Sequence, residues 1–255
     1  MHLAAWQWLL AAFSALLIGF SKTGLPGAGI VAVPLLASAF GARLSVGTAL
    51  PLLLVGDLCA LASYRAHADW GQLRRLLPWV ALGLLSGTLA LWVLGSLHLT
   101  SDPLGPLIGG LILGMLALNV LRPHLGERLQ PYSPVGTALT GVLAGCTTMI
   151  SNAGGPIMSI FMVAAGLPKQ QMMGTSAWNF FIFNLAKGPL LLLLTLLTPG
   201  QPLFTAASLR LSLQLGPLVL LGAWLGRWLL PQLPERLFSA LVLLLAGAAA
   251  LKLLL

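Results

Sequence analysis

Charged residues are scarce in this sequence: Asp, Glu, Lys and Arg make up 7% of its 255 residues. A soluble domain has about 25% charged residues, so this chain lacks the side chains needed for a water-facing surface. Hydrophobic residues make up 58%, and the mean hydropathy is +0.97. We therefore expect an all-α polytopic membrane protein with lipid as its outer solvent, because helices satisfy their backbone hydrogen bonds internally.

Residues for several other chemistries are missing. The two cysteines, Cys59 and Cys146, lie in apolar runs, and the four histidines are scattered, so we expect no disulfide framework and no metal site. No His-Glu-x-x-His motif, paired aspartates or Ser/His arrangement is present, which argues against an enzyme and a resident cofactor. The net charge of +8 forms no basic stripe interleaved with aromatics, so no nucleic-acid partner is expected.

Apolar runs divide the chain into segments. A helix needs about 20 apolar residues to cross the hydrocarbon core. Six runs are long enough: residues 45–63, 76–97, 103–121, 176–197, 205–230 and 236–254. Four others form two pairs, 3–20 with 30–40 and 135–150 with 157–166, each around a glycine-rich break. The breaks fall at residues 21–29 and 151–156.

The pairs of runs indicate an internal repeat. A shift of 127 positions superposes the first copy on the second, and it grows to 139 beyond a longer loop near 198–204. The matched pairs include Gly27 with Gly154, Asp57 with Asn184, Gly83 with Gly222 and Gly87 with Gly226. We therefore expect two transmembrane repeats, residues 1–121 and 135–255, joined by a cytoplasmic linker at 122–134.

The distribution of basic residues indicates how the repeats are oriented. If each broken pair is a re-entrant hairpin, each repeat adds three transmembrane helices and the repeats are inverted. Eight Lys and Arg residues then fall on one face and three on the other; with full crossings the split is six to five. The positive-inside rule favours two inverted repeats with both termini outside.

The two breaks are the first candidate site. Non-helical backbone at membrane depth must be buried in protein or line a cavity, and a restarting helix presents free N–H groups to anions. The candidate residues of the breaks are Thr23, Gly27, Gly29, Ser151, Asn152, Gly154 and Gly155. We expect Ser151 and Asn152 to act as N-caps. The alternative is that glycine and proline only permit kinks and close packing.

Three ionisable residues lie within apolar runs: Lys22, Asp57 and Lys187. Intramembrane charges cost about 2.5–3.5 kcal/mol each, so they are usually functional. Two cations and one acid favour binding of an anion. A plain Lys–Asp ion pair, with the second lysine snorkelling, is the alternative. Asp57 is the candidate for proton coupling; structural charge balance is its alternative role.

Short polar residues follow each hairpin and complete the candidate substrate shell: Thr48, Thr175, Ser176 and Asn179. Their hydroxyl and amide groups could donate hydrogen bonds to an anion. Ordinary N-capping of the following helices is the alternative.

Together, the motifs "GLPGAG", "NAGGP" and "GTSAWNFFIFNLAKGP" resemble the TauE/SafE family of membrane anion transporters. The resemblance covers essentially the whole chain. It implies transport of small sulfur oxyanions or organosulfonates across a bacterial inner membrane. The family's first copy usually has Thr-Ser after the hairpin, whereas this chain has Ala49 in the Ser position, which argues against a hydroxyl ligand there.

We therefore predict a multi-pass secondary transporter for a small sulfur-containing anion such as sulfite, thiosulfate or an organosulfonate. The lipid bilayer and the anion are its expected partners. A passive anion channel and a carrier of a non-sulfur anion remain alternatives. The small-x-x-x-small pairs also suggest a homodimer, since this spacing allows close helix approach.

Overall fold

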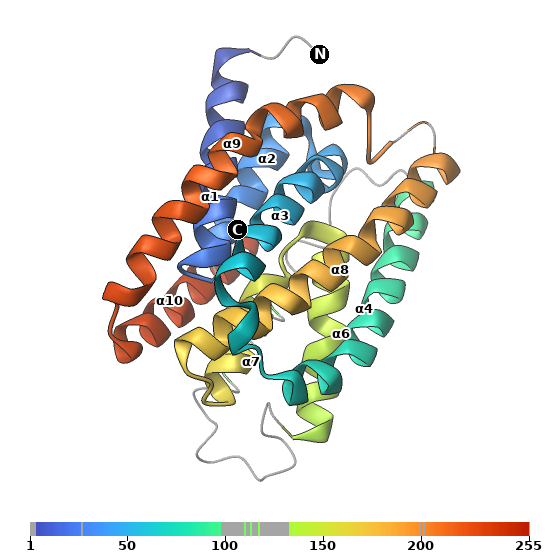
Figure 1. Cartoon of the computed structure of the whole chain (residues 1–255). Helices are drawn as coiled ribbons and strands as arrows, with labels where there is room; N and C mark the ends of the chain where they lie inside the picture. The colour runs from blue at the N-terminus through green and yellow to red at the C-terminus, as the bar shows by residue number, and fades with distance from the viewer. Residues whose placement is uncertain are drawn as a thin grey trace.

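The computed structural model describes residues 4–26, 28–97, 110, 113, 117, 133–198, 200 and 202–254. Every element assigned in these ranges is helical (Figure 1). Five helical stretches within them are long and apolar enough to cross a membrane: Arg43–His67, Trp70–Val93, Pro134–Ser151, Lys169–Leu197 and Ala206–Gln232. This confirms the prediction of an all-helical chain with membrane-length helices.

Four of the six long apolar runs coincide with these stretches. The run at 236–254 falls within α10 (Glu235–Leu254). The run at 103–121 and the linker at 122–134 lie almost wholly outside the described residues. The run at 135–150, which we assigned to a hairpin, is itself membrane length as α6 (Pro134–Ser151).

The first hairpin joins α1 (Ala5–Thr23) to α2 (Ala32–Phe40) through a short 3-10 helix, η1 (Ala28–Val31). The amide of Gln7 donates a 2.8 Å hydrogen bond from Nε2 to the carbonyl of Ala39. The start of α1 therefore lies beside the end of α2, so the chain returns to the end from which it came. The predicted break is present between the two helices.

The second hairpin joins α6 to α7 (Gly154–Ala164) through two residues. Asn152 adopts a left-handed conformation, with φ 59°, and caps the end of α6. Ala153 precedes α7 and makes no side-chain cap. The expectation that Ser151 and Asn152 are N-caps is therefore wrong. So tight a reversal needs a left-handed residue, and asparagine adopts that conformation more easily than most residues.

The helices after the hairpins, α3 (Ala42–Tyr64) and α8 (Lys169–Leu197), cross antiparallel. Near the crossing, Asn184 is hydrogen-bonded to Asp57. Gly174, near the start of α8, lies against the carbonyl of Tyr64 at the end of α3. Figure 1 shows α3 and α8 running in opposite directions through the centre of the molecule.

Four polar candidates lie inside these two helices: Thr48, Thr175, Ser176 and Asn179. The N-cap positions are Gly41 for α3 and Pro168 for α8. The alternative interpretation of the four residues as N-caps is therefore wrong. Helix α3 begins three residues before the apolar run 45–63, and α8 begins seven residues before the run 176–197. The additional residues extend each helix beyond its apolar run.

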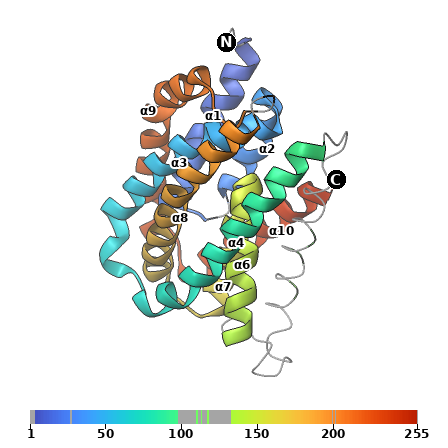
Figure 2. The same cartoon turned by 90° about the vertical axis from the view of Figure 1, so that its right-hand side faces the viewer.

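Two parallel helix pairs flank the crossing, α1 with α9 (Ala206–Leu229) and α4 (Trp70–Leu97) with α6. The members of each pair lie side by side in Figures 1 and 2. A Cβ atom on Gly19 would lie 1.9 Å from the Val219 oxygen, and one on Gly145 would lie 2.3 Å from the Val80 oxygen. Only glycine allows the backbones of these pairs to approach so closely.

The predicted small-x-x-x-small pairs belong to these internal contacts. Gly83 and Gly87 face α6, and Gly222 and Gly226 face α1. These faces are therefore covered within one chain and are not available to a second copy. Two short 3-10 helices complete the described elements: η2 (Arg65–His67) before α4 and η5 (Leu230–Gln232) after α9. Helix α10 packs against α7.

Candidate functional site

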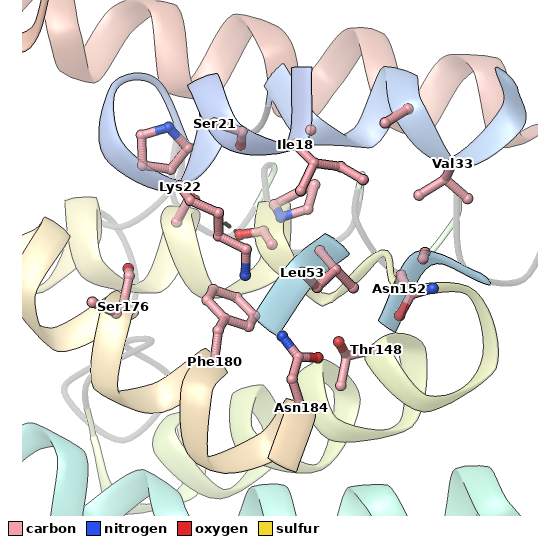
Figure 3. A pocket seen from close by; sticks show the side chains of 18 of the residues that line it. Ile18, Ser21, Lys22, Val33, Leu53, Thr148, Asn152, Ser176, Phe180 and Asn184 are labelled. Carbon is pink, nitrogen blue, oxygen red and sulfur yellow. Dashed lines mark hydrogen bonds between the residues drawn. The ribbon is translucent and has the colours of Figure 1, made fainter. Parts of the chain in front are cut away.

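A cavity of about 80 Å³ lies between the two hairpins, α3 and α8. A buried water needs roughly 10–15 Å³ measured this way, so the cavity has room for several waters or one small polyatomic anion. Lys22, Asn152, Ser176, Phe180 and Asn184 are among the residues that line it (Figure 3). The cavity therefore lies where the two chain breaks meet the crossing of α3 and α8.

The walls of the cavity differ in polarity. The first half of the chain contributes mainly apolar side chains to it, namely Ile18, Ala32, Val33, Leu36, Ala49 and Leu53. The second half contributes most of the polar ones, namely Thr148, Asn152, Ser159, Ser176 and Asn184. The first half adds Ser21, Lys22 and Ser45, so a ligand would meet hydrogen-bonding groups and hydrocarbon within one cavity.

Lys22 carries positive charge to this cavity. Its ammonium lies 2.6 Å from Oδ1 of Asp57 and 4.4 Å from the ring centroid of Phe180. Figure 3 shows the side chain reaching from α1 towards Phe180 and Asn184. Asn184 in turn donates a 2.6 Å hydrogen bond from Nδ2 to Oδ2 of Asp57. The Asp57 carboxylate is therefore held from both sides, by a cation on α1 and by an amide on α8.

Lys187 lies behind the polar wall, one helical turn beyond Asn184. Its ammonium donates a 2.7 Å hydrogen bond to the carbonyl of Thr148 and another to Oδ1 of Asn152. The side chain is 0% exposed. Because both acceptors belong to residues that line the cavity, the charge of Lys187 acts on the cavity through its wall.

The charges of the site do not cancel. Within the described part of the chain, the one ion pair joins Lys22 and Asp57, and Lys187 is bonded to neutral oxygens. Asp57 and Lys187 are both 0% exposed, and Lys22 is 14% exposed. One buried positive charge is left without a counterion, and such a charge is costly in a dehydrated interior. The arrangement favours an anion.

The candidate residues from the sequence fall into three groups. Those that line the cavity are Lys22, Gly29, Asn152, Gly155 and Ser176. Asp57 and Lys187 contact lining residues from behind. The other described candidates are absent from the lining: Thr23, Thr48, Ser151, Gly154, Thr175 and Asn179. Gly27 lies outside the described residues.

Several candidates beyond the lining bond elsewhere. The Thr23 hydroxyl donates a 2.6 Å hydrogen bond to the carbonyl of Ala223 and thus joins α1 to α9. The hydroxyls of Thr48 and Ser151 donate to carbonyls of their own helices. Thr175 accepts a 2.9 Å hydrogen bond from the backbone N–H of Asp69. These four hydroxyls are therefore bonded to backbone groups, two within their own helices and two across elements.

Asn179 differs from these residues. It is fully buried, and neither of its amide atoms has a hydrogen-bond partner among the described residues.

Sequence reasoning missed other lining residues. Thr148 precedes Asn152 by four residues, and Phe180 lies four residues after Ser176 and four before Asn184. This spacing puts each set on one helix face. Applied to "GTSAWNFFIFNLAKGP" and to the residues before "NAGGP", it would have identified the cavity-facing side of α8 and α6. The apolar wall gives no such signal, because its residues resemble any membrane-facing or core side chain.

The helices and their buried charges define a polytopic membrane protein with a cavity suited to a small anion. The chain belongs to the sulfite exporter TauE/SafE family, whose family model matches residues 11–253. Comparisons with curated proteins and with solved structures found no match. Membership of this family makes the protein a membrane transporter rather than an enzyme, with a small anion as its substrate.

Proposed function

We propose that this protein is a secondary transporter that moves a small sulfur-containing anion across the bacterial inner membrane by alternating access. The observation that carries the proposal is the internal cavity bordered by Lys22, with Lys187 buried behind its wall. Family membership supports the anionic substrate. The anion would accept hydrogen bonds from Lys22, Asn152 and Ser176.

We propose further that residues 1–121 and 135–255 are inverted repeats. A two-fold axis in the membrane plane requires equivalent helices to cross antiparallel at equivalent residues. The antiparallel crossing of α3 and α8 supports this relation, because Asp57 and Asn184 are 127 positions apart and bond to each other. Repeats related by an axis along the membrane normal would instead place these helices parallel.

Contacts away from the crossing support the same symmetry. A Cβ atom on Gly47 of α3 would lie 1.9 Å from the Leu203 oxygen, and one on Gly174 of α8 would lie 2.5 Å from the Tyr64 oxygen. The Leu203 carbonyl lies in the connection before α9, and Tyr64 is the last residue of α3, directly before the connection to α4. Because 47 and 174 are also 127 apart, each repeat makes the same contact with the other.

Basic side chains in the first turns of α3 and α8 make similar contacts with backbone carbonyls. Arg43, in the first turn of α3, donates a 3.3 Å hydrogen bond to the carbonyl of Leu91. Lys169, in the first turn of α8, donates a 3.3 Å hydrogen bond to the carbonyl of Leu230. Leu91 and Leu230 are 139 positions apart, which is the shift of this part of the repeat. Arg43 and Lys169 are 126 apart, one position short of the 127-residue shift, so the two donors are neighbours of equivalent positions.

The cavity draws on equivalent positions of both repeats. Its lining includes the pairs Gly29 with Pro156, Ala32 with Ser159, Ala49 with Ser176 and Leu53 with Phe180. A site on a pseudo-two-fold axis can open to either side of the membrane if the two repeats exchange conformations. This supports a carrier over a passive channel, which needs no such exchange.

The polarity of the walls favours a short organosulfonate over inorganic sulfite within the sulfur-anion class. The sulfonate oxygens would accept hydrogen bonds from Lys22 and the polar side chains of the second half, and the carbon chain would pack on apolar lining residues such as Leu36 and Leu53. Burying apolar surface contributes roughly 0.8 kcal/mol per CH₂ group, which inorganic sulfite cannot gain. We also propose that Asp57, the carboxylate bonded to Lys22, couples transport to protons.

Counterflow into proteoliposomes tests the proposal. Vesicles loaded with unlabelled ethanesulfonate should transiently accumulate labelled ethanesulfonate from outside, because a carrier exchanges substrate. Lys22→Met should lose this accumulation, and Arg210→Gln, which removes an exposed charge on α9, should retain it. Rapid equilibration without accumulation would indicate a channel, and no ethanesulfonate-dependent flux would contradict the proposed function.

A further inference from the structure

Asp57 differs from every other group around the cavity, because it is a carboxylate beside an anion site. It lies on α3 and is held by Lys22 of α1 and Asn184 of α8. Its negative charge offsets one of the two ammonium groups. Lys187 leaves the site with one positive charge, because it bonds to the neutral oxygens of Thr148 and Asn152.

No other described charge is placed to alter this balance. The helices packed against α3 are α1, α2, α6, α8 and α9. Of these, α2 and α6 carry no Asp, Glu, Lys, Arg or His, and α9 carries only Arg210 and Arg227, both exposed. The 3-10 helix η2, which also contacts α3, carries Arg65 and His67, and both are exposed. The charged groups facing Asp57 are therefore Lys22 from α1 and Lys187 from α8. The net charge of the empty site follows from these three side chains.

We propose that Asp57 sets the charge of the anion that the site accepts, so that the site selects a monoanion and rejects a dianion. This inference rests on the proposed function. A monoanion neutralises the single positive charge, whereas a dianion would leave one buried negative charge. In a low-dielectric interior, one uncompensated charge changes binding strongly. Without the carboxylate, the same site would carry two positive charges and favour a dianion.

The equivalent residue Asn184 provides a reciprocal change. Asp57→Asn raises the net charge of the site by one with almost no change in side-chain shape. Asn184→Asp by itself would bring two carboxylates into contact, where they would share one proton, so the reciprocal change is made together with Asp57→Asn. The double variant Asp57→Asn/Asn184→Asp exchanges the two side chains and restores the original charge. If charge determines the selection, the preference between a monoanion and a dianion must change with the net charge of the site in each variant.

Methanesulfonate and sulfate are the appropriate probes, because both are tetrahedral sulfur anions of similar size that differ by one charge. Their dissociation constants would be measured by calorimetry on the purified full-length protein at neutral pH. The wild type should bind methanesulfonate more tightly than sulfate. Asp57→Asn should shift the affinity ratio towards sulfate by about tenfold or more, since a neighbouring charge acts through a low dielectric.

The double variant makes the test decisive. Asp57→Asn/Asn184→Asp restores a single carboxylate to the contact, so it should return the affinity ratio towards that of the wild type. If Asp57→Asn does not fold, Asp57→Ser, which removes the same charge, is measured instead. An affinity ratio that stays unchanged when the Asp57 carboxylate is removed would overturn charge selection while leaving the anion site intact. Failure of the wild type to bind either anion would instead contradict the proposed function.

Discussion

Asn184 donates a 2.6 Å hydrogen bond to Asp57, and the two residues are 127 positions apart, which is the shift that relates the two proposed repeats. Two positions paired by this shift therefore meet, and one carries a carboxylate while the other carries a neutral amide. If the repeats are equivalent as proposed, this difference makes the site asymmetric in charge. It also connects the charges of α1, α3 and α8 into one cluster.

Close packing of α1 against α9 predicts a large effect of one methyl group. A Cβ atom on Gly222 would lie 2.0 Å from the Leu16 oxygen, so Gly222→Ala should destabilise the protein by about 1–3 kcal/mol. Gly216, on the same helix, has no neighbour within 4 Å of such an atom, so Gly216→Ala is the matched control. Thermal unfolding in detergent should separate the two variants; equal melting temperatures would contradict the packing.

The hairpins predict which loops share a face of the membrane. The backbone N–H of Asp69 is bonded to Thr175, so the α3–α4 turn and the start of α8 should face the same compartment. In a background lacking Cys59 and Cys146, His67→Cys and Gln170→Cys should react with an impermeant thiol reagent from the cytoplasmic side. Gly200→Cys should react from the opposite side. Labelling of the first two positions from opposite sides would contradict inverted hairpins.

The proton-coupling proposal makes a separate prediction. Asp57→Asn removes a titratable group that faces Lys22 and Lys187, so a pH gradient should no longer accelerate anion flux into proteoliposomes. Methanesulfonate binding should survive, because both ammonium groups remain. Flux would be measured over a series of imposed gradients with wild-type and variant protein. Identical acceleration of both would refute the role of Asp57 in coupling.

Arg43 should stabilise the protein from the end of α3. Its guanidinium donates to the Leu91 carbonyl and to the Thr198 hydroxyl, and each hydrogen bond to a charged group contributes about 1.5–3 kcal/mol. Arg43→Ala should therefore lower the melting temperature. Arg210→Ala, at an exposed position on α9, should change it little. Equal effects of the two substitutions would show that the contacts of Arg43 contribute no special stability.

Glycine and proline made the chain breaks predictable. The stretches 21–29 and 151–156 interrupt apolar runs that are otherwise helical, and both are where the helices end. The shift of 127 positions also paired Asp57 with Asn184, which are in contact. Such features depend on local chemistry and sequence register, which a single sequence contains.

The orientation of side chains around each helix was less predictable. Thr175 and Asn179 belong to the same motif as Ser176, yet only Ser176 lines the cavity. Neighbouring positions on a helix differ by about 100° in direction, and packing of α8 against α3 and α4 decides which direction faces the cavity. The apolar wall escaped prediction for a related reason, since Leu53 and Ile18 have no polar group to distinguish them from core residues.

The central claim is that the buried ammonium groups bind a small anion, and calorimetric titration with ethanesulfonate tests it most directly. Purified wild-type protein should bind one anion per chain. Lys22→Met and Lys187→Met should each weaken binding by about tenfold or more, because a charge beside the anion is lost in a low-dielectric interior. Arg210→Gln should bind as the wild type does. Unchanged binding in folded samples of both lysine variants would contradict the account.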